Sequence, residues 1–174
     1  MEFAPEAAFL TTTLDDYGRE HQIDHFDLLM LDVEGAELAA LEGADVSLSQ
    51  PADVAPRIVF EIHSRYSDWS RGLENTDIIR FLRSFGYHVF AVRDYHGNRP
   101  MGDAPIEIIS PEQTVIDGPP HGFNMLAVKR IEMIDDAHFR MCRNVSPKLL
   151  PHKDPALYAP IDGWPALTSV TAAA

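Results

Sequence analysis

The sequence contains a single cysteine, Cys142, among 174 residues. One cysteine excludes an intramolecular disulfide and a cysteine-rich zinc site. No apolar run approaches the roughly 18–20 residues of a membrane-spanning helix. No basic stretch precedes an apolar one near the N-terminus, so the sequence does not predict a secretory signal. These absences favour a soluble protein in a reducing, cytoplasmic setting.

Positive charge is also scarce. Lys and Arg together number 14 against 27 Asp and Glu, which leaves a net charge of −13. Nucleic acids and anionic membranes are bound by clustered positive charge, so we expect neither as a partner. The sequence contains no P-loop, no G-x-G-x-x-G and no G-x-S-x-G motif. Hydrophobic residues still make up 45% of the chain, which suffices for a packed core.

Apolar runs of strand length alternate with helical patterns in the first half of the chain. This alternation predicts an α/β sheet with parallel central strands. Ligands of such sheets bind beyond the carboxyl ends of the strands. The expected strands are Phe26–Val33, Arg57–His63 and Tyr87–Val92, and the expected helices are 36–44 and 75–85.

The second half is richer in Pro and Gly, and its elements are expected to be shorter. We expect a short edge strand at Glu107–Ile109 and a last strand at Asn124–Val128 that pairs antiparallel with the third strand. A short helix is expected near Asp135–Cys142. The chain is accordingly divided into a domain over residues 1–130 and a Pro-rich extension over residues 131–174.

Ionisable side chains occur where the first two strands end. The first strand ends in Asp32-Val33-Glu34 and the second in Glu61-Ile62-His63. Side chains alternate along a strand, so Asp32 and Glu34 share a side, as do Glu61 and His63. Unpaired carboxylates are costly within apolar strands. If the two strands are neighbours, these four groups converge at one edge of the sheet.

Each of these groups has a functional and a structural interpretation. Asp32 ends a hydrophobic strand, which favours a functional role. The ordinary pKa of histidine suits proton transfer, so His63 is a candidate general base. His63 could equally be a hydrogen-bonded loop residue. Glu34 and Glu37 could instead complement the dipole of the following helix. Glu61 could form an ion pair with a nearby arginine.

Several segments together resemble the FkbM family of methyltransferases. They are TLDDY at residues 13–17, IDHFDLLMLDVEGAELAALEGA at 23–44, IVFEIH at 58–63 and FLRSFGYHVF at 81–90. The resemblance implies a methyltransferase, usually an O-methyltransferase, that uses S-adenosylmethionine. It also implies the Rossmann-like fold of class I methyltransferases, here incomplete, with a mostly parallel sheet and an antiparallel closing strand.

The resemblance also assigns roles to residues. Asp32 and Glu34 match the motif that follows the fourth strand of that fold, where the methyl group and the acceptor meet. Asp32 is thereby expected to contact the cofactor and, with Glu34 and His63, to take part in catalysis. Glu61 and His63 match the end of the fifth strand, which faces the acceptor. Glu37 and Glu61 are expected to bind the substrate, a small molecule or sugar that offers a hydroxyl.

The glycine-rich cofactor loop of the family would lie upstream of the TLDDY segment, which begins near the start of this sequence. The chain therefore resembles the carboxyl half of such an enzyme. We expect weak or no binding of S-adenosylmethionine by these 174 residues alone. Half a sheet would also expose an unpaired edge strand, which favours self-association.

Two alternatives remain open at this point. The chain could be a non-catalytic remnant, or a half-domain that depends on a partner for the rest of the site. It could also be an Mg²⁺-assisted enzyme, because carboxylates and one imidazole are suitable ligands for Mg²⁺ or Mn²⁺.

Overall fold

The computed structural model describes residues 11–93, 104–116, 122–135 and 137–147. The stretches at 94–103 and 117–121, with His121, and the Pro-rich tail from residue 148 lie outside the described residues. The helices are α1 (Leu14–Glu20), α2 (Glu37–Glu42), α3 (Asp45–Ser49) and α4 (Asp77–Ser84). The strands are β1 (Leu28–Leu31), β2 (Arg57–Ile62), β3 (His88–Val92), β4 (Ile106–Ile109), β5 (Phe123–Val128) and β6 (Phe139–Cys142). Three short 3₁₀ turns are η1 (Leu73–Asn75), η2 (Pro111–Gln113) and η3 (Ile131–Met133).

The six strands form one mixed sheet in the order β1-β2-β5-β3-β4-β6. β1 pairs parallel with β2, and β5 pairs antiparallel with β3, as predicted. The expectation of a mostly parallel sheet is wrong, because β5 lies between β2 and β3 and runs antiparallel to both. β4 also pairs antiparallel with β3. The fold is therefore a mixed α/β arrangement.

Two predictions for the second half of the chain are also wrong. The strand at Ile106–Ile109 is not an edge strand, because β6 pairs with it on its outer side. The segment expected to form a helix contributes that strand, Phe139–Cys142. The pairing with β4 and the packing of Phe139 against a small apolar cluster outweigh the local helical tendency. The sheet thus continues beyond residue 130.

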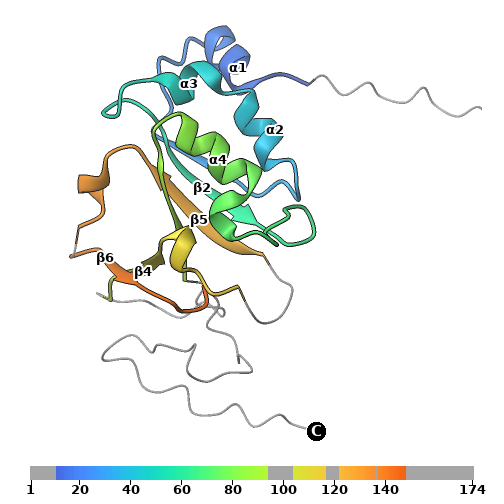
Figure 1. Ribbon diagram of the computed structural model, residues 1–174. Coiled ribbons are helices and arrows are strands. Elements are labelled where there is room, and N and C mark those ends of the chain that lie inside the picture. Colours follow the sequence, from blue (N-terminus) through green and yellow to red (C-terminus); the bar gives the residue numbers. More distant parts are fainter. Residues whose placement is uncertain (1–10, 94–103, 117–121, 136, 148–174) are drawn as a thin grey trace, which may run out of the picture.

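The main core lies between the helices and one face of the sheet. In Figure 1, α4 lies across β2 and β5, and α1, α2 and α3 lie towards the upper end of the sheet. The apolar stripe of α4 is buried, and the helix ends before Gly86, whose φ of 84° suits the residue after a helix C-cap. The most deeply buried core side chains are Leu41, Leu48, Ile58, Phe60, Ile79, Leu82, Ile109 and Met125.

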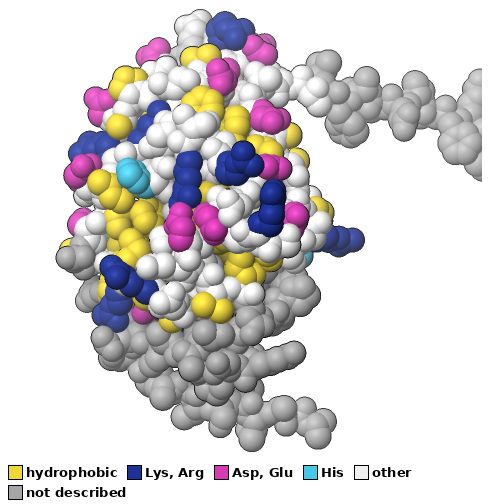
Figure 2. Space-filling view, in the orientation of Figure 1, with side chains coloured by type: hydrophobic (Ala, Val, Ile, Leu, Met, Phe, Trp, Pro, Cys, Tyr) yellow, Lys and Arg dark blue, Asp and Glu magenta, His cyan; other side chains and the backbone are white. Residues whose placement is uncertain are grey.

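The opposite face of the sheet carries a smaller apolar cluster around Phe90, Ile108 and Val128. On the edge strand β1, Leu28 and Met30 are 55% and 74% exposed. Self-association through this edge stays a prediction. None of the helices in the described segments is long and apolar enough to cross a membrane. On the face seen in Figure 2, acidic and basic side chains are interspersed.

Candidate functional site

The carboxyl ends of β1 and β2 lie side by side. The two strands are parallel, and Leu31 of β1 is paired with Phe60 of β2. The next residue along each strand is the acid that the sequence predicted, Asp32 and Glu61. The Glu61 carboxyl experiences the charges of Asp32 and His63. The structure therefore brings these three predicted residues together at one edge of the sheet.

The surroundings of Glu61 shift the pKa of its carboxyl group. Partial burial raises the pKa of Glu61, and the nearby Asp32 carboxylate raises it further. Glu34 and Glu37 act in the same direction, while His63 lowers the pKa. A raised carboxyl pKa in a group of acids is typical of sites that handle protons, and it also occurs in purely structural networks.

A tight turn follows β1 and presents Glu34. Glu34 and Gly35 both have positive φ, 52° and 100°, and Ala36 N–H donates to the Val33 carbonyl oxygen at 3.2 Å. A glutamate in this left-handed region costs about 1 kcal/mol or more, so the surroundings must hold it there. Such strain is common at functional sites. The turn directs Glu34 to the same edge as Asp32.

Glu37 supplies the contacts that hold this turn. Its carboxylate accepts hydrogen bonds from Val33 N–H at 3.1 Å and from Gly35 N–H at 3.0 and 3.2 Å. The side chain is buried, in contrast to the exposed Asp32 and Glu34. Glu37 is thus engaged by backbone, which corresponds to the structural interpretation of this residue.

Tyr66 covers the same turn from the loop after β2. Its hydroxyl donates to Glu34 Oε2 at 3.3 Å. A Cβ atom at Gly35 would lie 2.6 Å from Tyr66 Cγ, so the ring can lie here because residue 35 is glycine. Tyr66 is not among the site residues that the sequence predicted. The signal that could have identified it is its position, because it is an aromatic residue three positions after His63, which follows β2.

His63 follows β2 directly and is half-buried. Its Nδ1 accepts a hydrogen bond from Arg65 N–H at 2.9 Å. The imidazole lies 5.7 Å from the Tyr66 ring, centroid to centroid, at an interplanar angle of 51°. The ring is therefore oriented by its own loop, with one nitrogen engaged by backbone.

Gly122 is a second residue that the sequence analysis missed. It precedes β5, which lies beside β2, and it is buried. A Cβ atom at residue 122 would lie 2.5 Å from Glu61 Cδ and 2.9 Å from Glu61 Cγ. The Glu61 side chain thus occupies space that any larger residue at 122 would take. Sequence spacing could not reveal this contact, because it joins positions 61 residues apart.

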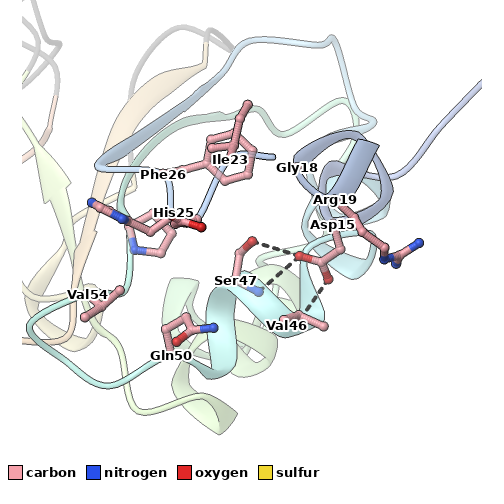
Figure 3. A pocket seen from close by; sticks show the side chains of 12 residues that line it. Asp15, Gly18, Arg19, Ile23, His25, Phe26, Val46, Ser47, Gln50 and Val54 are labelled. Atoms are coloured by element: carbon pink, nitrogen blue, oxygen red, sulfur yellow. Dashed lines mark hydrogen bonds between the residues drawn. The ribbon is translucent and has the colours of Figure 1, made fainter. Parts of the chain in front are cut away.

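A pocket of about 230 Å³ lies at the other end of β1 and β2, near the residues that precede both strands. Figure 3 shows Phe26, His25 and Val54 around it, with Asp15 bound to the start of α3. The Asp15 carboxylate accepts from Val46 N–H at 2.7 Å and from Ser47 N–H at 3.1 Å. The acids and His63 predicted as site residues do not line this pocket.

Metal ligation was the alternative chemistry for the acidic strand ends. Within the described ranges, no group of three or more His, Cys, Asp or Glu side chains is placed to hold a metal ion. The Mg²⁺ alternative therefore has no arrangement of side chains in its favour in the part of the chain that the structure describes.

The comparisons with known proteins agree with the sequence motifs. Residues 8–89 match the model of the Methyltransferase FkbM domain. This range contains β1, β2 and the turn between Val33 and Glu37. Neither the curated proteins nor the solved structures give a significant match. Over residues 8–89, the chain is therefore similar to the FkbM domain of methyltransferases.

Proposed function

We propose that this chain contributes the acceptor side of an S-adenosylmethionine-dependent O-methyltransferase. The observation that carries the proposal is the meeting of Asp32, Glu61 and His63 at the carboxyl ends of two parallel strands, within the segment that matches the family. Ligands of α/β sheets bind at this edge. The family match supports methyl transfer in general, and the O-methyl reaction is the part that we propose.

Asp32 is the proposed general base. Among the described residues, no group donates a hydrogen bond to the Asp32 carboxylate or forms an ion pair with it, and the side chain is exposed. It is therefore available to accept the proton of a hydroxyl group. A positioned base contributes about 10²–10⁴-fold to the rate. Alignment of the two reacting groups can contribute about 7–11 kcal/mol.

The reacting end of the cofactor is complementary in charge to the residues at this edge. S-adenosylmethionine supplies an activated methyl group on a cationic sulfur, and the exposed carboxylates of Asp32 and Glu34 suit a cation. The Gly35 N–H at the turn is not available to the adenosine part, because it already donates to the Glu37 carboxylate. We accordingly expect weak binding of the cofactor by this chain alone.

The proposed acceptor is a small molecule or sugar that carries a neutral hydroxyl group. The rim of the site is formed by Asp32, Glu34 and the Tyr66 hydroxyl. Negative charge here disfavours phosphorylated acceptors, because like charges repel at short range. Hydroxyl groups can donate to carboxylates and to the Tyr66 oxygen without a charge penalty.

Transfer of labelled methyl groups from S-adenosylmethionine to a panel of hydroxylated acceptors, by the chain joined to a segment that binds the cofactor, tests the proposal. We expect Asp32→Asn to lower the rate by about 10²–10⁴-fold. Asp53→Asn is the matched control, because Asp53 is exposed in the loop before β2, at the opposite edge of the sheet. An Asp32→Asn variant with the wild-type rate would refute the assignment of the base.

Calorimetric titration of the 174-residue chain with S-adenosylmethionine tests the cofactor side. The expected result is weak or undetectable binding. Tight one-to-one binding would show that these residues form a complete cofactor site. Absence of any methyl transfer by the chain, alone or joined to a segment that binds the cofactor, would favour the non-catalytic alternative.

A further inference from the structure

The hydrogen bond at His63 determines which ring nitrogen is available to a ligand. Nδ1 accepts from Arg65 N–H at 2.9 Å. A nitrogen that accepts a hydrogen bond carries no proton, so the proton of the neutral imidazole is on Nε2. If Nε2 were to act as a base from the neutral ring, Nδ1 would have to carry the proton and would face the Arg65 N–H donor directly. The observed geometry opposes that tautomer.

We propose that His63 acts as a hydrogen-bond donor through Nε2–H, and that it positions the acceptor oxygen rather than removing the acceptor's proton. This inference rests on the proposed O-methyltransferase function and refines it. The proton is then received by a carboxylate at the same edge, Asp32. The sequence had left both residues as candidates for the base, and the hydrogen bond from Arg65 separates their roles.

Other contacts keep the imidazole in this orientation. The Tyr66 ring packs at an interplanar angle of 51° against it, with centroids 5.7 Å apart. Tyr66 is itself held by the hydrogen bond of its hydroxyl to Glu34. His63 interacts electrostatically with Glu61, so the imidazole lies near that carboxyl group. The ring is thus a fixed group beside the acids.

A donor at this position selects the class of nucleophile. A hydroxyl oxygen has two lone pairs, so one can accept from Nε2–H while the other attacks. A neutral amine nitrogen has one lone pair, and donation from His63 would occupy it. In the proposed step the acceptor oxygen forms a bond to the methyl carbon, and the carbon–sulfur bond breaks with its electron pair left on sulfur. The acceptor's proton moves to Asp32. His63 therefore favours methylation of oxygen over nitrogen.

Nitrogen NMR of the chain tests the tautomer without any assay of activity. Long-range ¹H–¹⁵N spectra, recorded about two units above the ordinary imidazole pKa of about 6.5, distinguish the protonated from the unprotonated ring nitrogen. His63→Gln identifies the His63 signals among those of the eight histidines. We expect the proton on Nε2. A proton on Nδ1 would overturn the proposal, whatever the chain catalyses.

Two amide substitutions test the role in methyl transfer. The Gln amide nitrogen can take the place of Nε2, whereas the shorter Asn places its amide near Nδ1. We expect His63→Gln to stay within about threefold of the wild-type rate, and His63→Asn to fall about tenfold, the loss of one hydrogen bond. His25→Gln, beside the pocket at the other edge, should leave the rate unchanged.

The outcomes separate this inference from the proposed function. If both His63 variants lose 10²-fold or more, His63 is a base and the inference is wrong, while O-methylation stands. If the wild type transfers methyl groups to amines as readily as to hydroxyls, the selection of oxygen is also wrong. A chain without methyl transfer that shows the proton on Nε2 would contradict the proposed function and leave the His63 orientation intact.

Discussion

Acidic side chains lie at both ends of the paired strands β1 and β2, but they differ in their hydrogen bonding. At the amino end, the carboxylate of Asp15 accepts two backbone N–H groups and the Ser47 hydroxyl, so its hydrogen-bonding capacity is used to hold α3. At the carboxyl end, Asp32 is exposed and the described residues donate no hydrogen bond to it. The carboxyl end also carries the turn in which Glu34 adopts a positive φ of 52°.

This difference shows how an acid used for structure can be distinguished from one that is free to react. A carboxylate that caps a helix stabilises the fold and has little capacity left for a ligand. An exposed carboxylate beside another acid contributes nothing comparable to stability, and it retains its capacity for a substrate. Volume alone would point away from the proposed site, because the pocket of about 230 Å³ is at the amino end of the strands.

Substitution of Glu37 is expected to have the largest effect on stability. This glutamate lies at the carboxyl ends of the strands, but its carboxylate holds the turn after β1. Glu37→Ala leaves the Val33 and Gly35 N–H groups without their carboxylate acceptor. The expected loss is about 2–3 kcal/mol in the free energy of unfolding, measured by chemical denaturation. Glu42→Ala, exposed on the same helix, should change it by less than about 0.5 kcal/mol. Equal effects would mean that Glu37 does not hold the turn.

A pair of glycine substitutions compares the two edges directly. Gly122→Ala should cost about 1 kcal/mol, because its methyl group would displace the Glu61 side chain. Gly18→Ala, inside α1, should stabilise the protein by about 0.5–1 kcal/mol, because its Cβ meets Phe26 at an ordinary 3.5 Å. Thermal or chemical denaturation measures both. A neutral Gly122→Ala would show that Glu61 can lie elsewhere at no cost.

Two adjacent aspartates in α1 sharpen the comparison at the amino edge. Asp15→Ala removes the cap of α3 and should destabilise the chain by about 1 kcal/mol. Asp16→Ala removes an exposed ion pair with Arg19. It keeps the backbone N–H of residue 16, which donates to the Thr13 hydroxyl oxygen at the α1 N-cap. We expect a smaller loss, below about 0.5 kcal/mol, since exposed ion pairs contribute little. A larger loss of stability for Asp16→Ala than for Asp15→Ala in denaturation experiments would contradict the capping role of Asp15.

The smallest expected effect is a dependence on pH at the carboxyl edge. Burial and Asp32 raise the pKa of Glu61, so its favourable contribution is complete below the ordinary value of 4.5 and is lost as the pH rises through the raised pKa. Glu61→Gln removes this penalty. The variant should therefore unfold at higher denaturant concentration than the wild type near neutral pH.

The same comparison below about pH 4 provides the internal control, because Glu61 is then protonated in both the folded and the unfolded state. The advantage of Glu61→Gln should disappear there. Glu20→Gln, at the exposed end of α1, should show no such change with pH. An advantage that persists at low pH would mean that the amide itself packs better than the carboxyl, and that ionisation is not the cause.

Local patterns predicted much of the first half of the chain. The strand at Arg57–Ile62 and the position of Gly86 after α4 were predictable, because strand periodicity and helix termination depend on residues a few positions apart. The parallel pairing of β1 with β2 followed from the alternation of strands and helices. The sequence predicts the approach of Asp32 to Glu61 on the condition that the two strands are neighbours, and the structure pairs them.

The sequence by itself determined that acids and an imidazole end two apolar strands, since each apolar run is interrupted by those residues. Tertiary structure alone decided that β5 lies between β2 and β3 and that residues 139–142 form a strand. It also decided that Gly122 makes room for Glu61 and that Tyr66 covers Gly35. The physical reason is the distance along the sequence. These contacts join residues about 30 or more positions apart, so they contribute energy only after folding has brought those residues together.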